Sequence, residues 1–258
     1  MEISFYLAVI ALTCAAGYYV KSLSVSGAIA AFVTGSVIAL GFQWKGLLLL
    51  GVFFASSSLW SKYKKQQKGK LDEVLEKGER RDWVQVAANS SVASFTSLMY
   101  YFTELDMWML GFIVAIAAAN ADTWGSEIGV LSKSNPYYIL SLRQVEKGTS
   151  GAVSILGTVA SLLGSLCIAL FAFFLFSFQS FALLVMIVFL GFSGSLLDTV
   201  LGATCQARYT CTACGLITEK REHCASQTRL TKGIRWYNND FVNWTSITLV
   251  TCVSLFLT

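Results

Sequence analysis

The sequence predicts an all-α, polytopic membrane protein, a helical bundle of about eight transmembrane helices (seven to nine). Of its 258 residues, 55% are hydrophobic and only 13% are charged, whereas soluble domains carry about 25% charged residues. Proline occurs once, and apolar stretches fill most of the chain. We therefore expect residues 1–258 to form a single integral membrane domain.

Eight stretches are long enough, or nearly so, to cross a bilayer, which takes about 20 residues. They are 3–20, 25–42, 45–60, 84–102, 107–124, 151–177, 180–202 and 238–257. The second and third are short enough to form a tight hairpin, which keeps seven to nine spans open. The first stretch has no basic region before it and no cleavage site after it, so we expect no secretory signal.

The basic residues indicate the orientation of the bundle, because cytoplasmic loops are enriched in Lys and Arg. With eight spans, eighteen of the nineteen basic residues fall on one face, in the loops 61–83, 125–150 and 203–237 and at Lys21. Only Lys45 lies opposite. We therefore predict a basic cytoplasmic loop at 61–83, a cytoplasmic Cys-rich loop at 203–237, and both termini outside the cell membrane.

Acidic residues interrupt two apolar runs. Asp122-Thr123 and Asp198-Thr199 each end a predicted span, and an ionisable group at a bilayer centre costs roughly 2.5–3.5 kcal/mol. Four separate spans place carboxylates or amides at the same cytoplasmic level. These residues are Gln85, Asn89, Asn120, Asp122, Glu127, Asp198, Asn239, Asp240 and Asn243.

Helix capping explains each of these polar groups singly, but it explains four converging helices poorly. Carboxylates with neutral oxygen donors suit Mg²⁺, which completes its shell with water and phosphate. The sequence therefore predicts a magnesium site held by Asp122 and Asp198, with its active face toward the cytoplasm.

A phosphate site also needs donors, and Lys147-Gly148-Thr149-Ser150-Gly151 precedes the sixth predicted span. A small-residue turn at a helix N-terminus offers free N–H groups, although such a loop is usually only a turn. No P-loop motif occurs. The single histidine, His223, nearly excludes histidine acid–base chemistry. A phosphate monoester is already a nucleophile at neutral pH and needs no such base.

The seven cysteines fall into two groups. Cys14, Cys167 and Cys252 lie in apolar runs, where cysteine is typically a small packing residue. The other four, Cys205, Cys211, Cys214 and Cys224, lie in or beside the predicted cytoplasmic loop, where disulfides are disfavoured, and three of them offer, with a histidine, a structural Zn²⁺ site. The alternative is a reduced, unliganded loop, because adjacent His and Cys both ligate only with an unusual turn. The ligand set consists of Cys211, Cys214, His223 and Cys224.

At these motifs the chain resembles the membrane proteins of the domain-of-unknown-function 92 group, which includes plant phytyl-phosphate kinase and animal transmembrane protein 19. The matching stretches are Q-V-A-A-N (85–89), A-N-A-D-T-W-G-S-E-I-G (119–129), K-G-T-S-G (147–151) and N-N-D-F-V-N (238–243). The resemblance implies a prenyl-phosphate kinase, which makes a prenyl diphosphate from the monophosphate and a nucleoside triphosphate.

The leading hypothesis is therefore a Mg²⁺-dependent phosphotransferase acting on a membrane isoprenoid monophosphate with CTP or ATP, and without nucleic acid. Asp122 and Asp198 hold Mg²⁺. Lys147, Gly148, Thr149 and Ser150 cradle phosphate, and the remaining polar residues, Gln85, Asn89, Asn120, Glu127, Asn239, Asp240 and Asn243, orient phosphates or the metal's surroundings. The alternatives are a transporter or flippase of a lipid phosphate, and a membrane scaffold that displays the zinc loop.

Overall fold

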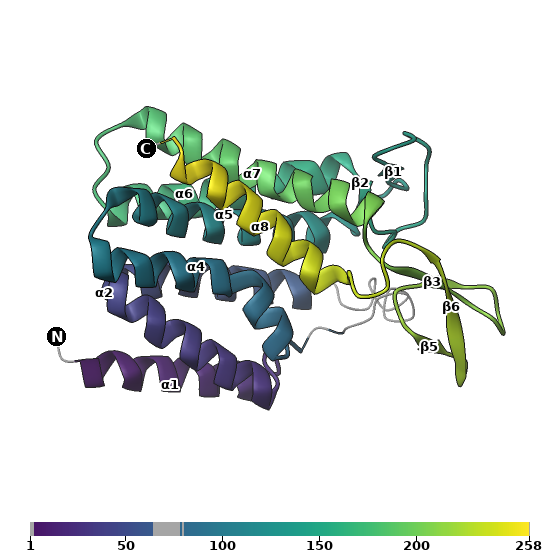
Figure 1. The fold of residues 1–258 in the computed structure, drawn as a ribbon, viewed down its shortest axis with the longest axis horizontal. Coiled ribbons are helices and arrows are strands. Elements are labelled where there is room, and N and C mark those ends of the chain that lie inside the picture. Colours follow the sequence, from purple (N-terminus) through teal and green to yellow (C-terminus); the bar gives the residue numbers. More distant parts are fainter. Residues whose placement is uncertain (1–2, 64–77, 79, 258) are drawn as a thin grey trace.

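The computed structural model of the protein describes residues 3–63, 78 and 80–257, and it is mostly helical (Figure 1). Within these ranges seven helices occur: α1 (Ile3–Tyr19), α2 (Val25–Lys62), α4 (Trp83–Thr103), α5 (Asp106–Gly129), α6 (Ile155–Leu175), α7 (Phe181–Thr204) and α8 (Asn239–Leu255). Four of them, α2, α5, α6 and α7, are long and apolar enough to cross a membrane. The predicted count of eight spans stays a prediction.

Helix α2 folds back on itself in the middle. Its 38 residues would extend about 57 Å if straight, yet Lys62 Nζ donates a hydrogen bond to Val20 O at 2.5 Å, and Val20 lies just before the helix begins. The reversal is at Gln43, whose φ of 50° and ψ of −138° are not helical. Two antiparallel arms, 25–42 and 44–62, therefore form the hairpin that the sequence leaves open for these two short stretches.

Helix α5 forms the centre of the bundle. All of its residues from Leu110 to Ala121 are buried, and it packs against α2, α4, α6, α7 and α8. Small residues let its neighbours approach closely. An added Cβ at Gly164 of α6 would lie 3.0 Å from the Asn120 carbonyl of α5. The C-terminal end of α5, where the polar motif lies, is thereby surrounded by other helices.

The all-α prediction is wrong for the loops. Strands β3 (Arg208–Cys211), β4 (Ile217–Thr218), β5 (Glu222–His223) and β6 (Ser226–Lys232) form an antiparallel sheet in the order β4-β3-β6-β5. Strands β1 (Tyr137–Tyr138) and β2 (Ala152–Val153) form a second, two-stranded sheet. Most of β6 is exposed, so its sequence lacks the apolar alternation by which strands are recognised.

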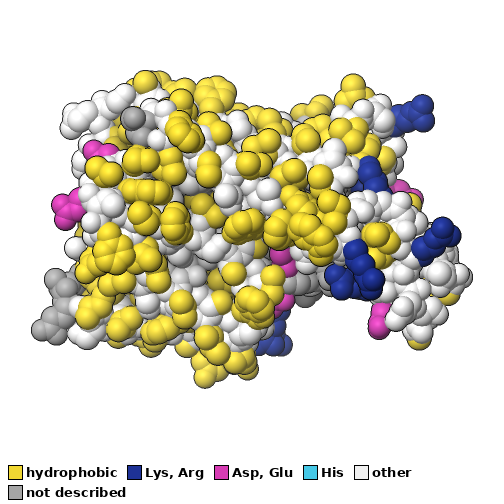
Figure 2. All heavy atoms as spheres, in the orientation of Figure 1, with side chains coloured by type: hydrophobic (Ala, Val, Ile, Leu, Met, Phe, Trp, Pro, Cys, Tyr) yellow, Lys and Arg dark blue, Asp and Glu magenta, His cyan; other side chains and the backbone are white. Residues whose placement is uncertain are grey.

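Charge is distributed unevenly between the two ends of the bundle. The loops after α1, α5 and α7 lie at the same end, and the Lys and Arg side chains visible in this view gather there, whereas Asp and Glu side chains are seen at both ends (Figures 1 and 2). Lys45 lies at the opposite end, with its Nζ 5.6 Å from the ring centre of Phe176. Most of the predicted basic loop, 64–77 and 79, falls outside the described residues. Which side of the membrane the basic end faces stays a prediction.

Candidate functional site

A polar cavity of about 370 Å³ lies at the basic end of the bundle. It is bounded by the ends of α5 and α7, by the beginnings of α4, α6 and α8, and by the turn before β2. Segments from distant parts of the sequence thus meet at one place. The predicted site residues that line the cavity are Gln85, Asn89, Asp122, Glu127, Lys147, Gly148, Thr149, Ser150, Asp198, Asn239, Asp240 and Asn243.

Two carboxyl groups from different helices face each other in this cavity. Asp122 of α5 and Asp198 of α7 are half-buried and lie within side-chain hydrogen-bonding contact. Ser246 Oγ of α8 donates to Asp198 Oδ2 at 3.3 Å. Three central helices therefore meet at the pair of aspartates that the sequence predicts to hold magnesium.

The amide of Asn243 lies beside this pair. Its nitrogen donates to Asp198 Oδ2 at 2.8 Å and to Asn239 O at 3.2 Å, because the opposite orientation of the amide would face its oxygen toward two acceptors. A cation bound by Asp198 would favour the turned amide, whose neutral oxygen is a ligand of the kind that Mg²⁺ takes.

Asn120 is placed differently from the other predicted residues. It is completely buried, with 0% of its surface exposed, and it does not line the cavity. Its Nδ2 donates to Gly164 O of α6 at 2.8 Å, and its Oδ1 accepts from Ser56 Oγ of α2 at 3.1 Å. Both halves of the amide are therefore used to join α5 to its neighbours.

Arg81 lies at the cavity wall. In the sequence it is only one of the many basic residues of the loop 61–83. The main chain of Arg81 is fixed by hydrogen bonds from Ser24 N at 2.9 Å and to Ser22 O at 3.1 Å. Burial lowers the pKa of Arg81, while the nearby Glu127 carboxylate raises it. Glu127 also accepts a hydrogen bond from Ser61 Oγ at 2.7 Å. A partly buried cation thus faces the cavity next to a carboxylate.

The glycine-rich turn, residues 147–151, closes another side of the cavity. Gly148 and Gly151 have positive φ values of 84° and 79°, which favour glycine. An added Cβ at Gly151 would lie 2.5 Å from Ala203 Cα, so this position also needs glycine for space. Lys147 Nζ donates to Ser132 O. The turn is therefore tightly held, in contact with the end of α7.

The cavity wall also contains two residues of the Cys-rich loop, Gln206 and Glu219, which the sequence does not predict. Gln206 Nε2 donates to Glu219 Oε1 at 2.7 Å, and Gln206 Oε1 accepts from Ser150 Oγ at 2.5 Å. Arg208 Nη2 donates to Ser150 O at 2.7 Å. The sheet of the Cys-rich loop is thereby joined to the glycine-rich turn. No spacing in the sequence signals this contact.

At the beginning of α4, part of the predicted binding set also caps the helix. Asp82 Oδ1 accepts from Gln85 N at 2.9 Å, and Gln85 Oε1 accepts from Asp82 N at 3.1 Å, which together form a capping box. Asn89 Nδ2 donates to Gln85 O at 3.0 Å. Gln85 therefore has a structural role in addition to its place in the cavity wall.

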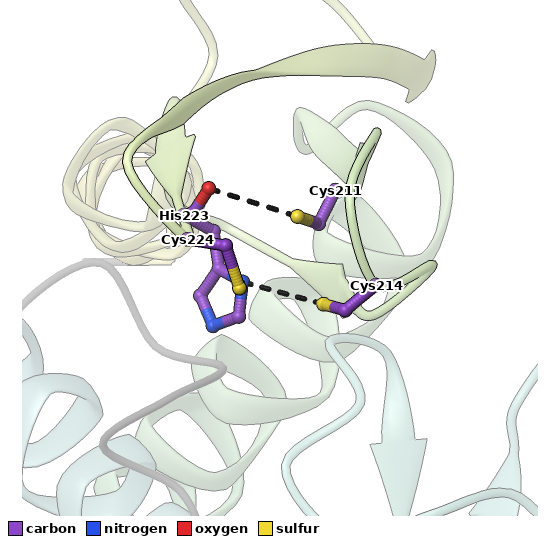
Figure 3. Close-up of side chains that lie close together, drawn as sticks. All are labelled: Cys211, Cys214, His223 and Cys224. Atoms are coloured by element: carbon purple, nitrogen blue, oxygen red, sulfur yellow. Dashed lines mark hydrogen bonds between the residues drawn. The ribbon is translucent and has the colours of Figure 1, made fainter.

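The second predicted site, outside the helical bundle, is a compact cluster of one histidine and three cysteines (Figure 3). The possible ligand atoms of Cys211, Cys214, His223 and Cys224 all lie within 4.8 Å of one another. His223 Nδ1 is 3.5 Å from Cys214 Sγ and 3.2 Å from Cys224 Sγ. Three cysteines and a histidine are a typical ligand set for a structural zinc, so this cluster can hold a metal.

The turn at 224–225 brings adjacent His and Cys residues to the same cluster. Cys224 and Ala225 both have positive φ, 52° and 54°, as a two-residue type I′ hairpin turn between β5 and β6 requires. The backbone N–H of Cys214, followed by contact with His223, lowers the pKa of the Cys211 thiol to about 6. Contact with the Cys214 side chain, followed by burial, raises the pKa of the Cys224 thiol to about 11.

The fold and the site define a helical membrane protein with a cavity of acids and amides at one end of its bundle. The chain matches the family described as integral membrane protein DUF92 over residues 8–251, and it belongs to this family. Protein PGR of Arabidopsis thaliana is 32% identical over 259 residues, which cover 90% of this chain and 88% of that protein.

Two further relatives extend the comparison. Protein VTE6, chloroplastic, from Arabidopsis thaliana is 28% identical over 246 residues, which cover 92% of this chain and 66% of that protein. An uncharacterized membrane protein of Methanocaldococcus jannaschii is 32% identical over 185 residues, which cover 71% of this chain and 74% of that protein. No solved structure matches the chain.

Proposed function

We propose that this protein is a lipid phosphotransferase that moves the terminal phosphoryl group of a nucleoside triphosphate, CTP or ATP, to an isoprenoid monophosphate in the membrane. The observation that carries the proposal is the facing pair Asp122 and Asp198 in a cavity that also contains the glycine-rich turn. The family resemblance to plant phytyl-phosphate kinase supports it.

Magnesium fits the donor set of the cavity. Asp122, Asp198 and the amide oxygen of Asn243 are hard oxygen ligands of the kind that Mg²⁺ binds, together with water and phosphate. When bound, Mg²⁺ neutralises charge on the transferring phosphoryl group. Asp122 and Asp198 are the residues that would hold it, and Ser246 positions the Asp198 carboxylate by its hydrogen bond.

The other cavity residues orient the two phosphorylated substrates. Lys147 and the N–H groups of the glycine-rich turn bind the nucleotide's phosphates, and Arg81 binds the acceptor's phosphate as a fork of donors. An oxygen of the acceptor phosphate forms a bond to the terminal phosphorus. The bond between that phosphorus and its bridging oxygen breaks, and the nucleoside diphosphate leaves. Such a transfer depends mainly on positioning and charge neutralisation.

A monophosphate acceptor suits the cavity because it needs neither a histidine nor a carboxylate as general base, which leaves the acids free to bind metal. The single histidine of the chain, His223, belongs to the cysteine cluster. An alcohol would need a general base to remove its proton, whereas a phosphate monoester is already dianionic near neutral pH. A water-soluble acceptor would give no reason to build the cavity from the ends of membrane helices.

A direct assay tests the proposal. Purified protein is incubated with Mg²⁺, labelled CTP or ATP, and either phytyl monophosphate or phytol. We expect labelled phytyl diphosphate from the monophosphate and no labelled product from the alcohol. Preference for the alcohol would overturn the mechanism. Inactivity with both acceptors and both nucleotides would favour the alternative function, transport of a lipid phosphate.

We also propose that Cys211, Cys214, His223 and Cys224 bind one structural Zn²⁺, which fixes the sheet that carries Gln206 and Glu219 to the cavity. We expect elemental analysis to find about one zinc per chain, lost when Cys211 and Cys214 become serine. Cys252→Ser serves as the control, because Cys252 is an exposed cysteine of α8 outside the cluster. Zinc-free wild-type protein from zinc-supplemented cells would refute the site.

A further inference from the structure

An apolar groove of about 510 Å³ runs beside the polar cavity. It is bounded by α1, both arms of α2 and the beginning of α4, and its volume is within the range of about 300–1,000 Å³ typical of small-molecule sites. In Figure 1, α1 lies at the edge of the bundle next to α2. Phe5, Val9, Trp44 and Leu48 line the groove and are themselves exposed, so the groove is open at the surface of the bundle.

The groove and the cavity meet at shared residues. Arg81, Gln85, Asn89 and Thr123 line both, and Thr123 follows the aspartate Asp122 directly in the sequence. The polar end of an otherwise apolar groove therefore opens at the proposed reaction centre. This arrangement matches a ligand with a long hydrocarbon chain and a charged head.

Arg81 gives this junction the charge that an anionic head requires. Its guanidinium lies 5.7 Å from the ring centre of Phe54, a groove residue, and interacts electrostatically with Glu127, a cavity residue. The side chain thus contacts an aromatic wall on one side and an acid on the other. A guanidinium binds phosphate through paired donors.

We infer that the groove holds the hydrocarbon chain of the acceptor, a linear isoprenoid monophosphate, with its phosphate at Arg81 and Asn89. This inference rests on the proposed function and assigns the acceptor's place within it. The apolar lining excludes a nucleotide from the groove, which leaves the glycine-rich side of the cavity for the phosphoryl donor. The groove also selects for chain length, because only a long chain reaches its distant part.

A substitution at Gly51 can test how far along the groove the bound chain extends. Gly51 lines the groove, and an added Cβ there would meet nothing within 4 Å, so the helix accepts a side chain at this position, and we expect a phenylalanine to extend into the groove. Gly51 precedes the cavity residue Ser61 by about 15 Å along the second arm of α2. An extended chain advances about 1.2 Å per bond, so about twelve bonds separate the head from Gly51.

The experiment measures binding and turnover separately. Labelled geranyl and geranylgeranyl monophosphates are bound at equilibrium to purified wild-type protein, Gly51→Phe and Val33→Phe, without nucleotide. Val33 is 56% exposed on the other arm of α2 and does not line the groove, so it controls for added bulk on this helix pair. Displacement of even two buried methylene groups corresponds to about a tenfold loss of affinity.

We expect Gly51→Phe to raise the Kd of the geranylgeranyl compound at least tenfold, and to leave that of the shorter geranyl compound within about twofold. Val33→Phe should leave both unchanged. Equal affinities of Gly51→Phe and wild type for the long chain would overturn the inference, even with kinase activity present. Length-selective binding without any turnover would support the groove and refute the kinase.

Discussion

The facing carboxyl groups of Asp122 and Asp198 make magnesium binding measurable as a change in thermal stability. Two like charges about 4 Å apart repel each other by about 4 kcal/mol at an effective dielectric constant of about 20. The two groups are in side-chain contact and only partly exposed to water. A divalent cation bound by both replaces this repulsion with attraction, so we expect Mg²⁺ to stabilise the folded protein.

The size of the effect follows from linkage. Mg²⁺ at about 100 times its Kd adds about 2.7 kcal/mol to the free energy of unfolding, which raises the Tm of a chain of this size by about 5–11 °C. We expect Asp122→Asn and Asp198→Asn to lose this rise, because each removes a ligand. Without Mg²⁺ both should melt no lower than wild type, because a neutral amide relieves the repulsion.

The rise of Tm is measured by tryptophan fluorescence as the detergent-solubilised protein is heated at increasing Mg²⁺ concentrations. Phosphoryl transfer is assayed on the same samples. Asp106→Asn is the matched control, since Asp106 is an exposed acid in the first turn of α5, at the opposite end from Asp122. It should keep the full magnesium shift. A full shift and near wild-type turnover in both site variants would refute the magnesium site.

Three further predictions concern stability and topology. Asn120→Leu should lower the free energy of unfolding by about 1–3 kcal/mol in thermal melts, because it removes the hydrogen bonds to Ser56 and Gly164; a variant as stable as wild type would contradict this role. Ala225→Gly should keep the zinc content and raise stability by about 0.5–1 kcal/mol, since Ala225 has a φ of 54°; loss of zinc would argue against the turn. A cysteine introduced at Gln67, which lies outside the described residues, should resist impermeant labels in intact cells, and external labelling would reverse the predicted topology.

The sequence alone determined the membrane class of the protein, the convergence of its polar groups and the composition of its cysteine cluster. Hydrophobicity and helix length are local properties, and alternating spans bring Asp122, Asp198 and Asn243 to the same end of the bundle. The glycine-rich turn reaches the same cavity because it precedes a span at that end. Depth along the bundle could therefore be predicted without knowing which helices are neighbours.

Only the tertiary structure decided which side chains face one another across the bundle. Asn120 and Asp122 are two residues apart, yet the rotation of α5 buries Asn120 against α6 and points Asp122 into the cavity. The roles of Arg81 and Glu219, the sheet of the Cys-rich loop and the apolar groove likewise depend on long-range packing. Helix rotation and neighbour choice follow from the whole set of packed surfaces, so no segment of the sequence encodes them by itself.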